Sequence, residues 1–179
     1  ATLVDNKSSN DGKLRNAVFV HDFESPLLHK LTWPKVSWAP GLFDLDNDTD
    51  LDLFFANGHL NSVSGDNRQS NLLFENDGRG RFTDISEKSG VLATGDRIHR
   101  SAIFADYDDD GRVDIFVTVN GQQVEDGQGN NIFDPNQGKG ILFHNETKND
   151  NNWLKVRLEG TKSNRDGFGA TVSITAGPV

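Results

Sequence analysis

The sequence contains neither cysteine nor methionine. Without cysteine, the chain can form no disulfide scaffold, no iron–sulfur cluster and no thiolate zinc site. No stretch approaches the run of about 20 apolar residues that a membrane-spanning helix requires, so we expect no membrane span. Twelve Phe and three Trp are nevertheless present, which is enough to build a hydrophobic core rather than a disordered chain.

Basic residues are scarce relative to acidic ones, and glutamate is scarce relative to aspartate. The 179 residues include 18 Lys and Arg against 27 Asp and Glu, which gives a formal net charge of −9. This balance argues against nucleic acid as a partner, because nucleic-acid-binding domains need a basic footprint. The acidic residues are 21 Asp and 6 Glu. Since Asp favours tight turns and ligates hard cations, whereas Glu favours helices, the composition indicates an all-β, turn-rich protein with bound calcium.

Two segments of the chain repeat one another. Residues 42–58 read LFDLDNDTDLDLFFANG, residues 103–121 read IFADYDDDGRVDIFVTVNG, and the first Asp of each cluster lies 62 residues from the other. Both contain an apolar strand, an Asp cluster, a second apolar strand and an Asn-Gly turn, and no segment has a convincing helical period. The repeat and its turns predict strands at 36–43, 51–56, 71–75 and 81–85 in the first unit and at 101–105, 113–119, 140–144 and 153–158 in the second.

Four antiparallel strands per unit, repeated radially, are the plan of a β-propeller. The alternative is a sandwich with two similar hairpins, and the propeller is favoured because the repeated part includes the same special loop. We expect an all-β fold with blades at 36–100 and 101–150, and residues 1–35 as part of a preceding blade. A closed propeller needs about 4–8 blades. The sequence therefore predicts a partial propeller with open sheet edges.

Each repeated loop has the spacing D-x-D-x-D-x-x-x-D. Alternate carboxylates turn inward as the chain curls, position seven offers a backbone carbonyl and position nine closes the site, which suits Ca²⁺ with its 6–8 oxygen ligands at about 2.3–2.6 Å. Converging carboxylates repel one another unless a cation binds or their pKa values rise. We therefore predict two calcium sites. The predicted ligands are Asp44, Asp46, Asp48, Asp50 and Asp52 in the first loop and Asp106, Asp108, Asp110, Arg112 and Asp114 in the second.

These loops are not EF-hands, because position twelve, where an EF-hand needs a bidentate Glu, is Phe55 or Val117. The alternative interpretation is a solvated acidic turn, which two clusters at the same place in a repeat make less plausible. The loops differ at position six, which is Gly111 in the second and Thr49 in the first. Because left-handed backbone is unfavourable for a β-branched residue, we expect the first loop to bind more weakly or to use a different turn.

No catalytic set accompanies the loops. The five histidines include no pair with the i, i+4 spacing of a helical zinc site. Metal ligation explains the clustered carboxylates better than a glycosidase acid–base pair, since a general acid needs a raised pKa in an apolar pocket. Phenylalanines also recur at matched positions of the repeat. We interpret them as the layer packed between blades: Phe43, Phe54, Phe74, Phe82, Phe104, Phe116 and Phe143.

The D-x-D-x-D-G-x-x-D loop between two strands resembles the FG-GAP/VCBS repeat of integrin α-chain propellers and many secreted bacterial proteins. The string NLLFENDGRGRFTDIS (71–86) resembles the second hairpin of that repeat. The tail NNWLKVRLEGTKSNRDGFGATVSITAG (151–177) is similar to the start of the ASPIC/UnbV domain, which follows such repeats in cartilage acidic protein and its bacterial relatives. We therefore expect residues 151–179 to be the start of such a domain, as a truncated C-terminal β segment.

The resemblance implies a secreted or cell-surface protein, extracellular or periplasmic, whose calcium-bound propeller serves binding or adhesion more than catalysis. By position, it also implies that the Asp residues of both loops are calcium ligands. We predict a non-enzymatic module for binding, adhesion or assembly. Its ligand would be an unknown protein or glycan. The module would also associate with further copies of itself or with the remainder of a longer propeller chain. Two alternatives stay open: the propeller part of a secreted carbohydrate-active lyase or hydrolase, and a polymerising structural subunit.

Overall fold

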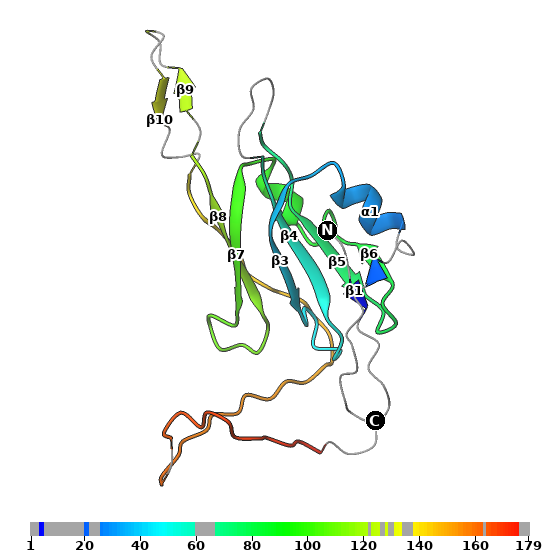
Figure 1. Cartoon of the computed structure of the whole chain (residues 1–179), viewed down its shortest axis with the longest axis vertical. Coiled ribbons are helices and arrows are strands. Elements are labelled where there is room, and N and C mark those ends of the chain that lie inside the picture. The colour runs from blue at the N-terminus through cyan, green and yellow to red at the C-terminus, as the bar shows by residue number, and fades with distance from the viewer. Residues whose placement is uncertain are drawn as a thin grey trace.

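Two antiparallel β-sheets lie side by side, with a short helix beside one of them and the C-terminal tail running below both (Figure 1). The fold is mostly β, and the described residues form no closed propeller. No helix among them is long and apolar enough to cross a membrane. The computed structural model describes residues 4–5, 20–21, 26–59, 67–121, 123–125, 128, 131–133, 138–162 and 164–175.

The first sheet has four strands in the order β3-β4-β5-β6. They are β3 (Ser37–Phe43), β4 (Asp52–Asn57), β5 (Leu72–Asn76) and β6 (Phe82–Asp84). Each boundary lies within one residue of the predicted one, because turn residues separate the apolar runs. Every residue of β4 is buried. A strand buried along its whole length needs cover on both faces of its sheet.

The second sheet has three strands in the order β11-β8-β7. They are β7 (His99–Ala105), β8 (Asp114–Val119) and β11 (Ile141–Phe143). The connection from β8 to β11 contains a separate antiparallel hairpin, β9 (Gln123–Glu125) with β10 (Asn131–Phe133). These three strands match the predicted ones, whereas the hairpin was not predicted.

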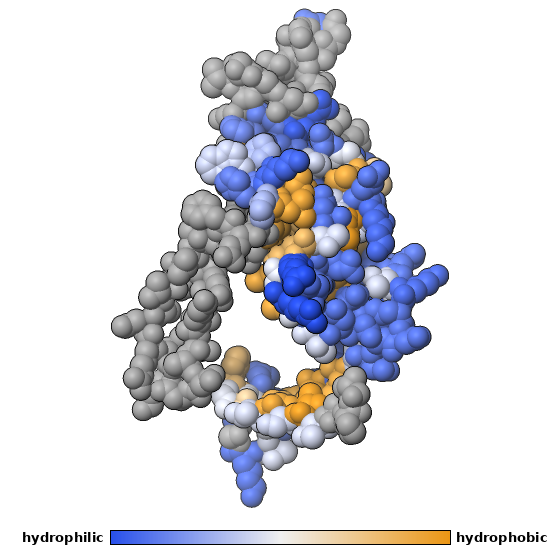
Figure 2. All heavy atoms as spheres, turned by 90° about the vertical axis from the view of Figure 1, so that its right-hand side faces the viewer, coloured by the Kyte–Doolittle hydropathy of each residue, from blue (hydrophilic) through white to orange (hydrophobic). Residues whose placement is uncertain are grey.

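The predicted fourth strand of this sheet, at 153–158, is wrong, because residues 151–160 form no strand. The alternation that predicted it comes from Trp153, Leu154, Val156 and Leu158, all of which are exposed. Apolar side chains gather at the lower end of the molecule, where the tail lies (Figure 2). A strand requires a hydrogen-bonding neighbour and a covered face, and the described residues offer this segment neither.

The helix α1 (Pro26–Thr32) corrects the all-β prediction. Its seven residues make only two turns, too few for a helical period to stand out, although Pro26 occupies the first position, where proline favours a helix. Leu28 is buried against β4 and β5, so α1 covers one face of the first sheet. Upstream, β1 (Val4–Asp5) pairs with β2 (Val20–His21). Most of the blade predicted at 1–35 falls outside the described residues.

The other face of the first sheet packs against the second sheet. Phe54 and Leu73 from the first sheet and Val117 from the second share one core cluster. The Phe104 ring stacks on Phe43 with 4.9 Å between ring centroids and meets Phe54 edge-on at 5.9 Å. The 3₁₀ helix η1 (Val91–Thr94) adds its buried first residue to this cluster. This core cluster therefore lies at the interface between the sheets, and a second one lies beneath α1.

The outer face of the second sheet is open. Ile103, Phe116 and Leu142 are 58%, 40% and 48% exposed, and they form a row because Phe116 pairs in register with both of the others. No second sheet among the described residues covers Phe116, so its interpretation as a residue packed between blades stays a prediction. The same interpretation is wrong for Phe74 and Phe82, since they pack in the cluster beneath α1. Alternation identifies the two faces of a strand, but it does not say what covers each face.

His99, at the start of β7, is a fully buried titratable residue. Its Nδ1 lies 2.9 Å from the backbone oxygen of Asn57 and 3.1 Å from that of Gln69. Because carbonyl oxygens only accept hydrogen bonds, Nδ1 must carry the proton, and Nε2 is left buried without a partner among the described residues. Burial is the main cause that lowers the pKa of His99.

We expect the protein to lose stability as the pH falls below about 6.5, the ordinary His pKa. Below that value His99 of the unfolded chain binds a proton that the folded chain resists, so the stability present at neutral pH is lost towards the lower folded pKa. His99→Asn, whose amide can donate to the same carbonyls, should reduce this loss. Melting temperatures of both proteins at neutral and mildly acidic pH, with calcium held constant, test it. Parallel pH profiles would show that other groups cause the loss.

Candidate metal centres

The first acidic loop joins β3 to β4. The two carboxylate oxygens of Asp44 accept hydrogen bonds from the backbone N–H groups of Asp48 and Thr49, both at 3.1 Å. Asp48 in turn accepts one from the N–H of Asp50 at 3.0 Å. These bonds curl the loop, as Asp side chains do in tight turns. As a result, carboxylate oxygens of Asp44, Asp46 and Asp48 lie within 4.8 Å of one another.

The second acidic loop joins β7 to β8 and has the same bonds. Asp106 accepts hydrogen bonds from the N–H groups of Asp110 at 3.0 Å and Gly111 at 3.1 Å. Asp110 accepts one from the N–H of Arg112 at 2.9 Å. Carboxylate oxygens of Asp106, Asp108 and Asp110 also lie within 4.8 Å of one another. The sequence repeat is therefore a repeat of hydrogen bonds as well.

Two positions in each loop adopt left-handed backbone. Position four is Asn47 (φ 59°) or Asp109 (φ 62°), and position six is Thr49 (φ 79°) or Gly111 (φ 85°). The alternative that the first loop uses a different turn is therefore wrong, and weaker binding there stays a prediction. Left-handed backbone costs a non-glycine residue about 1–2 kcal/mol. The bond from the Thr49 N–H to the carboxylate of the first Asp helps to hold this conformation.

The aspartate at position nine of each loop is buried and engaged by the backbone. Asp52 is 2% exposed, and one of its oxygens accepts a hydrogen bond from the N–H of Leu45 at 2.8 Å. Asp114 is equally buried and accepts the equivalent bond from Tyr107 at 3.2 Å. Each carboxylate thus ties the start of its loop to the following strand. Their assignment as calcium ligands stays a prediction.

An asparagine at or just after the end of a neighbouring strand completes each arrangement: Asn76 is the last residue of β5, and Asn145 lies two residues after β11. The N–H of Asn76 donates to Asp52 at 2.9 Å, and the N–H of Asn145 donates to Asp114 at 2.8 Å. The Nδ2 of Asn145 also donates to the backbone oxygen of Leu45 at 2.7 Å, which joins the second sheet to the first loop. Sequence reasoning missed this role, although each Asn follows an apolar triplet and one polar residue.

Both loops, with their shared pattern of bonds, lie in one continuous stretch of the chain. Residues 44–117 match the FG-GAP-like repeat. The match begins at the first Asp of the first loop and ends within β8, so it contains both acidic loops. It includes no part of the tail, and no match to an ASPIC/UnbV domain was found. No curated protein and no solved structure matches the chain.

The first loop of the FG-GAP-like stretch carries uncompensated negative charge. Burial, then the charges of Asp48 and Asp44, raises the pKa of Asp46, and burial, then Asp48 and Asp52, raises the pKa of Asp50. One oxygen each of Asp46 and Asp50 is buried without a hydrogen-bond partner in the described part of the chain. Buried, unpaired carboxylate oxygens among like charges are groups that a hard cation stabilises. The residues therefore fit Ca²⁺.

The second loop of the FG-GAP-like stretch is partly neutralised by cationic side chains. The guanidinium of Arg112 pairs with Asp110, and the ammonium of Lys155 pairs with Asp109. The Arg112 side chain therefore contributes positive charge at position seven, where the first loop has a carboxylate. The two loops share their backbone geometry but differ in their charge.

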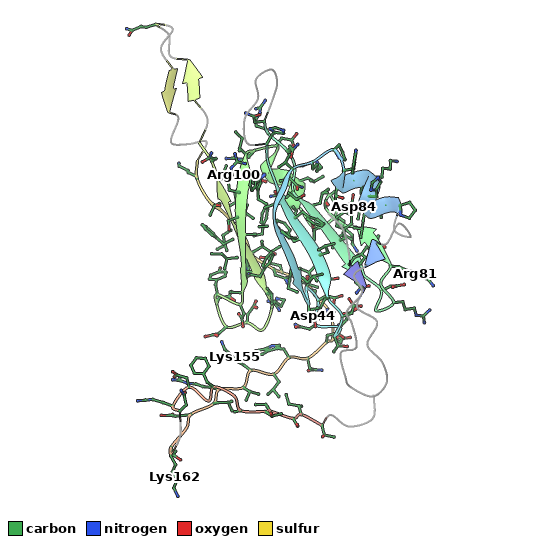
Figure 3. All side chains as sticks on the ribbon, viewed as in Figure 1. Asp44, Arg81, Asp84, Arg100, Lys155 and Lys162 are labelled. Atoms are coloured by element: carbon green, nitrogen blue, oxygen red, sulfur yellow. The ribbon has the colours of Figure 1, made fainter. Side chains whose placement is uncertain are left out.

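The two loops of the FG-GAP-like stretch touch at one end of the sheets. The Nδ2 of Asn47 donates to the backbone oxygen of Gly111 at 3.2 Å. Asp44 of the first loop and Lys155 of the tail both lie at this end (Figure 3). An open depression of about 510 Å³ lies between the loops and the tail. Its lining includes Asp44, Thr49, Asp106, Gly111, Trp153 and Lys155.

Proposed function

We propose that the chain is a calcium-stabilised, non-catalytic module for binding, adhesion or assembly. The observation that carries this proposal is the pair of acidic loops with the same hydrogen bonds, the first of which contains two buried carboxylate oxygens without partners. FG-GAP-like modules typically bind other molecules. Extracellular calcium modules bind with dissociation constants of about 10⁻⁴–10⁻³ M. A calcium-rich location, secreted or on the cell surface, in the extracellular space or the periplasm, therefore fits the proposal.

In this proposal calcium stabilises the loops and takes no part in a reaction. Oxygen-only loops of this type suit Ca²⁺ better than Mg²⁺, because Mg²⁺ keeps several waters and prefers few carboxylates. Position seven would contribute its backbone carbonyl. The proposed ligands are Asp44, Asp46, Asp48, Asp50 and Asp52, and Asp106, Asp108, Asp110, Arg112 and Asp114.

A depression of about 500 Å³ between the two sheets, next to the loops, is our candidate for the ligand site. Its apolar part includes Leu73, Ile115 and Phe143, and its polar part includes Asp46, Glu75, Lys88, His144 and Lys148. Apolar surface bordered by both acidic and basic groups suits a protein or glycan ligand better than a nucleic acid.

A thermal melt in calcium against one in excess chelator tests the proposal. A ligand at 100 times its dissociation constant adds about 2.7 kcal/mol of stability per site. For a chain of this size, we expect the melting temperature to rise by roughly 5–10 °C per occupied site.

Three controls sharpen this experiment. Mg²⁺ at the same concentration should raise the melting temperature much less. Asp46→Asn should remove the part of the calcium-dependent rise in melting temperature that the first loop contributes. Asp150→Asn, a change at an exposed aspartate outside both loops, should leave the whole rise unchanged. Equal melting temperatures in calcium and chelator would contradict the calcium sites.

Assembly is a second candidate function, favoured by the open row of Ile103, Phe116 and Leu142. At the repeat position of Phe116, the first sheet has Phe54, which the second sheet buries. We propose that this row packs against another sheet of the same kind, in a second copy or in the remainder of a longer propeller. The helix α1 covers the opposite outer face, so the first sheet is not open in the same way.

Light scattering at increasing protein concentration tests self-assembly through this row. We expect the apparent mass of the wild-type chain to rise with concentration and that of Phe116→Lys to stay constant, since a charge at the centre of the row opposes burial. Leu51→Lys, at an exposed leucine outside the row, serves as the control. A wild-type chain that stays monomeric at every concentration would contradict self-assembly.

We also propose that residues 151–177 are the start of an ASPIC/UnbV-type domain. The WLKVRLEGTKSNRDGFGA pattern supports this.

A further inference from the structure

His144, directly after β11, brings an imidazole nitrogen to the second acidic loop. Its Nδ1 lies 3.1 Å from an oxygen of Asp114 and 3.7 Å from an oxygen of Asp108. One ligand atom from each of these three residues lies within 4.8 Å of the others. The Tyr107 ring contacts the imidazole edge-on, with 5.8 Å between centroids. The three side chains therefore converge on one point.

The spacing of these atoms is that of ligands around a single ion. Two donors that each lie about 2.1 Å from one metal are about 3.0–3.6 Å apart when the angle between them is about 90–120°. The separations of 3.1 and 3.7 Å from Nδ1 are close to this range. Asp114 is buried, whereas His144 and Asp108 are about one-third exposed, so water can supply further ligands.

The donor types point to a different ion from that of the first loop. One imidazole nitrogen with two carboxylate oxygens suits borderline divalent ions such as Zn²⁺ and Co²⁺, whereas Ca²⁺ takes oxygen ligands. In the first sheet the residue that precedes the corresponding Asn is Glu75 rather than a histidine. That carboxylate lies close enough to raise the pKa of Asp46, so at this position the first loop has an oxygen donor where the second has an imidazole nitrogen.

One of the proposed calcium ligands of the second loop is already engaged in an ion pair. Arg112 pairs with Asp110, one of the three carboxylates that would otherwise converge on calcium. Asp108 is the member of that cluster that also faces His144. The loop therefore has a weakened oxygen-only set and, beside it, a mixed set of nitrogen and oxygen donors.

We propose that Asp108, Asp114 and His144 form a binding site for a borderline divalent cation of the zinc type, so that the two FG-GAP-like loops select different metals. The first loop, with Glu75 beside it, retains calcium. This inference rests on the proposed function and replaces one part of it: Asp108 and Asp114 would hold the zinc-type ion in place of Ca²⁺, so the second loop has its own ion and the calcium site of the first loop is unchanged.

Titration of the chelator-stripped full chain with Co²⁺, in saturating Ca²⁺, tests the proposal. We expect one equivalent of Co²⁺ to bind, with visible d–d absorption, and an equimolar amount of Zn²⁺ to displace it. His144→Gln should abolish this absorption and leave the calcium-dependent rise in melting temperature unchanged. His59→Gln, at an exposed histidine two residues after the end of β4, the end opposite the first acidic loop, should behave like the wild type.

Two outcomes would overturn the proposal. Equal Co²⁺ absorption in the wild type and His144→Gln would place the ion elsewhere. Absence of Co²⁺ binding, or its displacement by Ca²⁺, would show that His144 forms only an ion pair. Failure of the proposed function would give a different result. The calcium-dependent rise in melting temperature would then be absent in both the wild type and His144→Gln, while the wild type would keep its Co²⁺ absorption.

Discussion

Phe54→Ala is expected to lower the free energy of unfolding by about 3–5 kcal/mol, whereas Phe116→Ala should cost about 1 kcal/mol or less. The two phenylalanines occupy the same position of the repeat. Phe54 is 0% exposed at the interface of the sheets, and Phe116 is 40% exposed on the open face. Truncation of the first leaves a cavity beside the ring of Phe104, which meets Phe54 edge-on, while truncation of the second removes a partly solvated side chain.

Urea denaturation of both variants, at one calcium concentration and at low protein concentration, measures this difference. The slope of the unfolding free energy with urea should stay the same, because neither change alters the fold. Equal losses in the two variants would show that Phe116 is covered in solution, and would favour an assembled chain over a monomer with an open face.

Asp52→Ala should cost about 2–4 kcal/mol even in excess chelator, where no metal is bound. Its buried carboxylate accepts hydrogen bonds from the N–H groups of Leu45 and Asn76, and each buried N–H left unpaired costs about 1–3 kcal/mol. The charge itself is unfavourable, since burial is the main cause that raises the pKa of Asp52. Removal of this buried charge offsets part of the cost, so the expected loss is smaller than the summed cost of leaving two buried N–H groups unpaired.

Asp48→Ala is the matched control in the same loop. Asp48 is exposed, accepts one backbone bond and adds to the charges that raise the pKa of Asp46 and Asp50. In chelator its removal should therefore change stability by no more than about 0.5 kcal/mol, while in calcium both variants should lose the stabilisation that the first site supplies. Equal losses in chelator would mean that the two positions of the loop are not structurally distinct.

The sequence was sufficient to predict the strands that carry the loops. Turn residues bound the apolar runs of β3 to β6 and of β8, so both ends of these strands follow from the sequence, whereas β7 begins two residues before its predicted start. The loop geometry was predictable in outline, because Asp at alternate positions accepts backbone N–H bonds in the same way in both loops. Thr49 was the misleading residue. Its intrinsic preference argued against a left-handed turn, and the bonds to Asp44 prevailed.

Other features depend on contacts that no local pattern records. The helix α1 is too short to show a period and is positioned by the burial of Leu28 against the first sheet. The tail alternates like a strand but has no neighbour to pair with in the part of the chain that the structure describes. Which face of the second sheet is covered follows from the packing order of the sheets, so Phe116 and Phe54 could not be told apart. The nearness of His144 to Asp108 also arises only when β11 pairs with β8.

The side chain of Asn145 has a consequence for how the molecule unfolds. Its Nδ2 donates to the backbone oxygens of Leu45 in the first loop and of Val113 just before β8, while Asn47 donates across to Gly111. Repeat arrays with weak contacts between neighbours can lose their units one at a time. Here the two sheets share a core and are joined at the loop end, so we expect them to melt in a single cooperative transition. An ion held by either loop would then stabilise both sheets together.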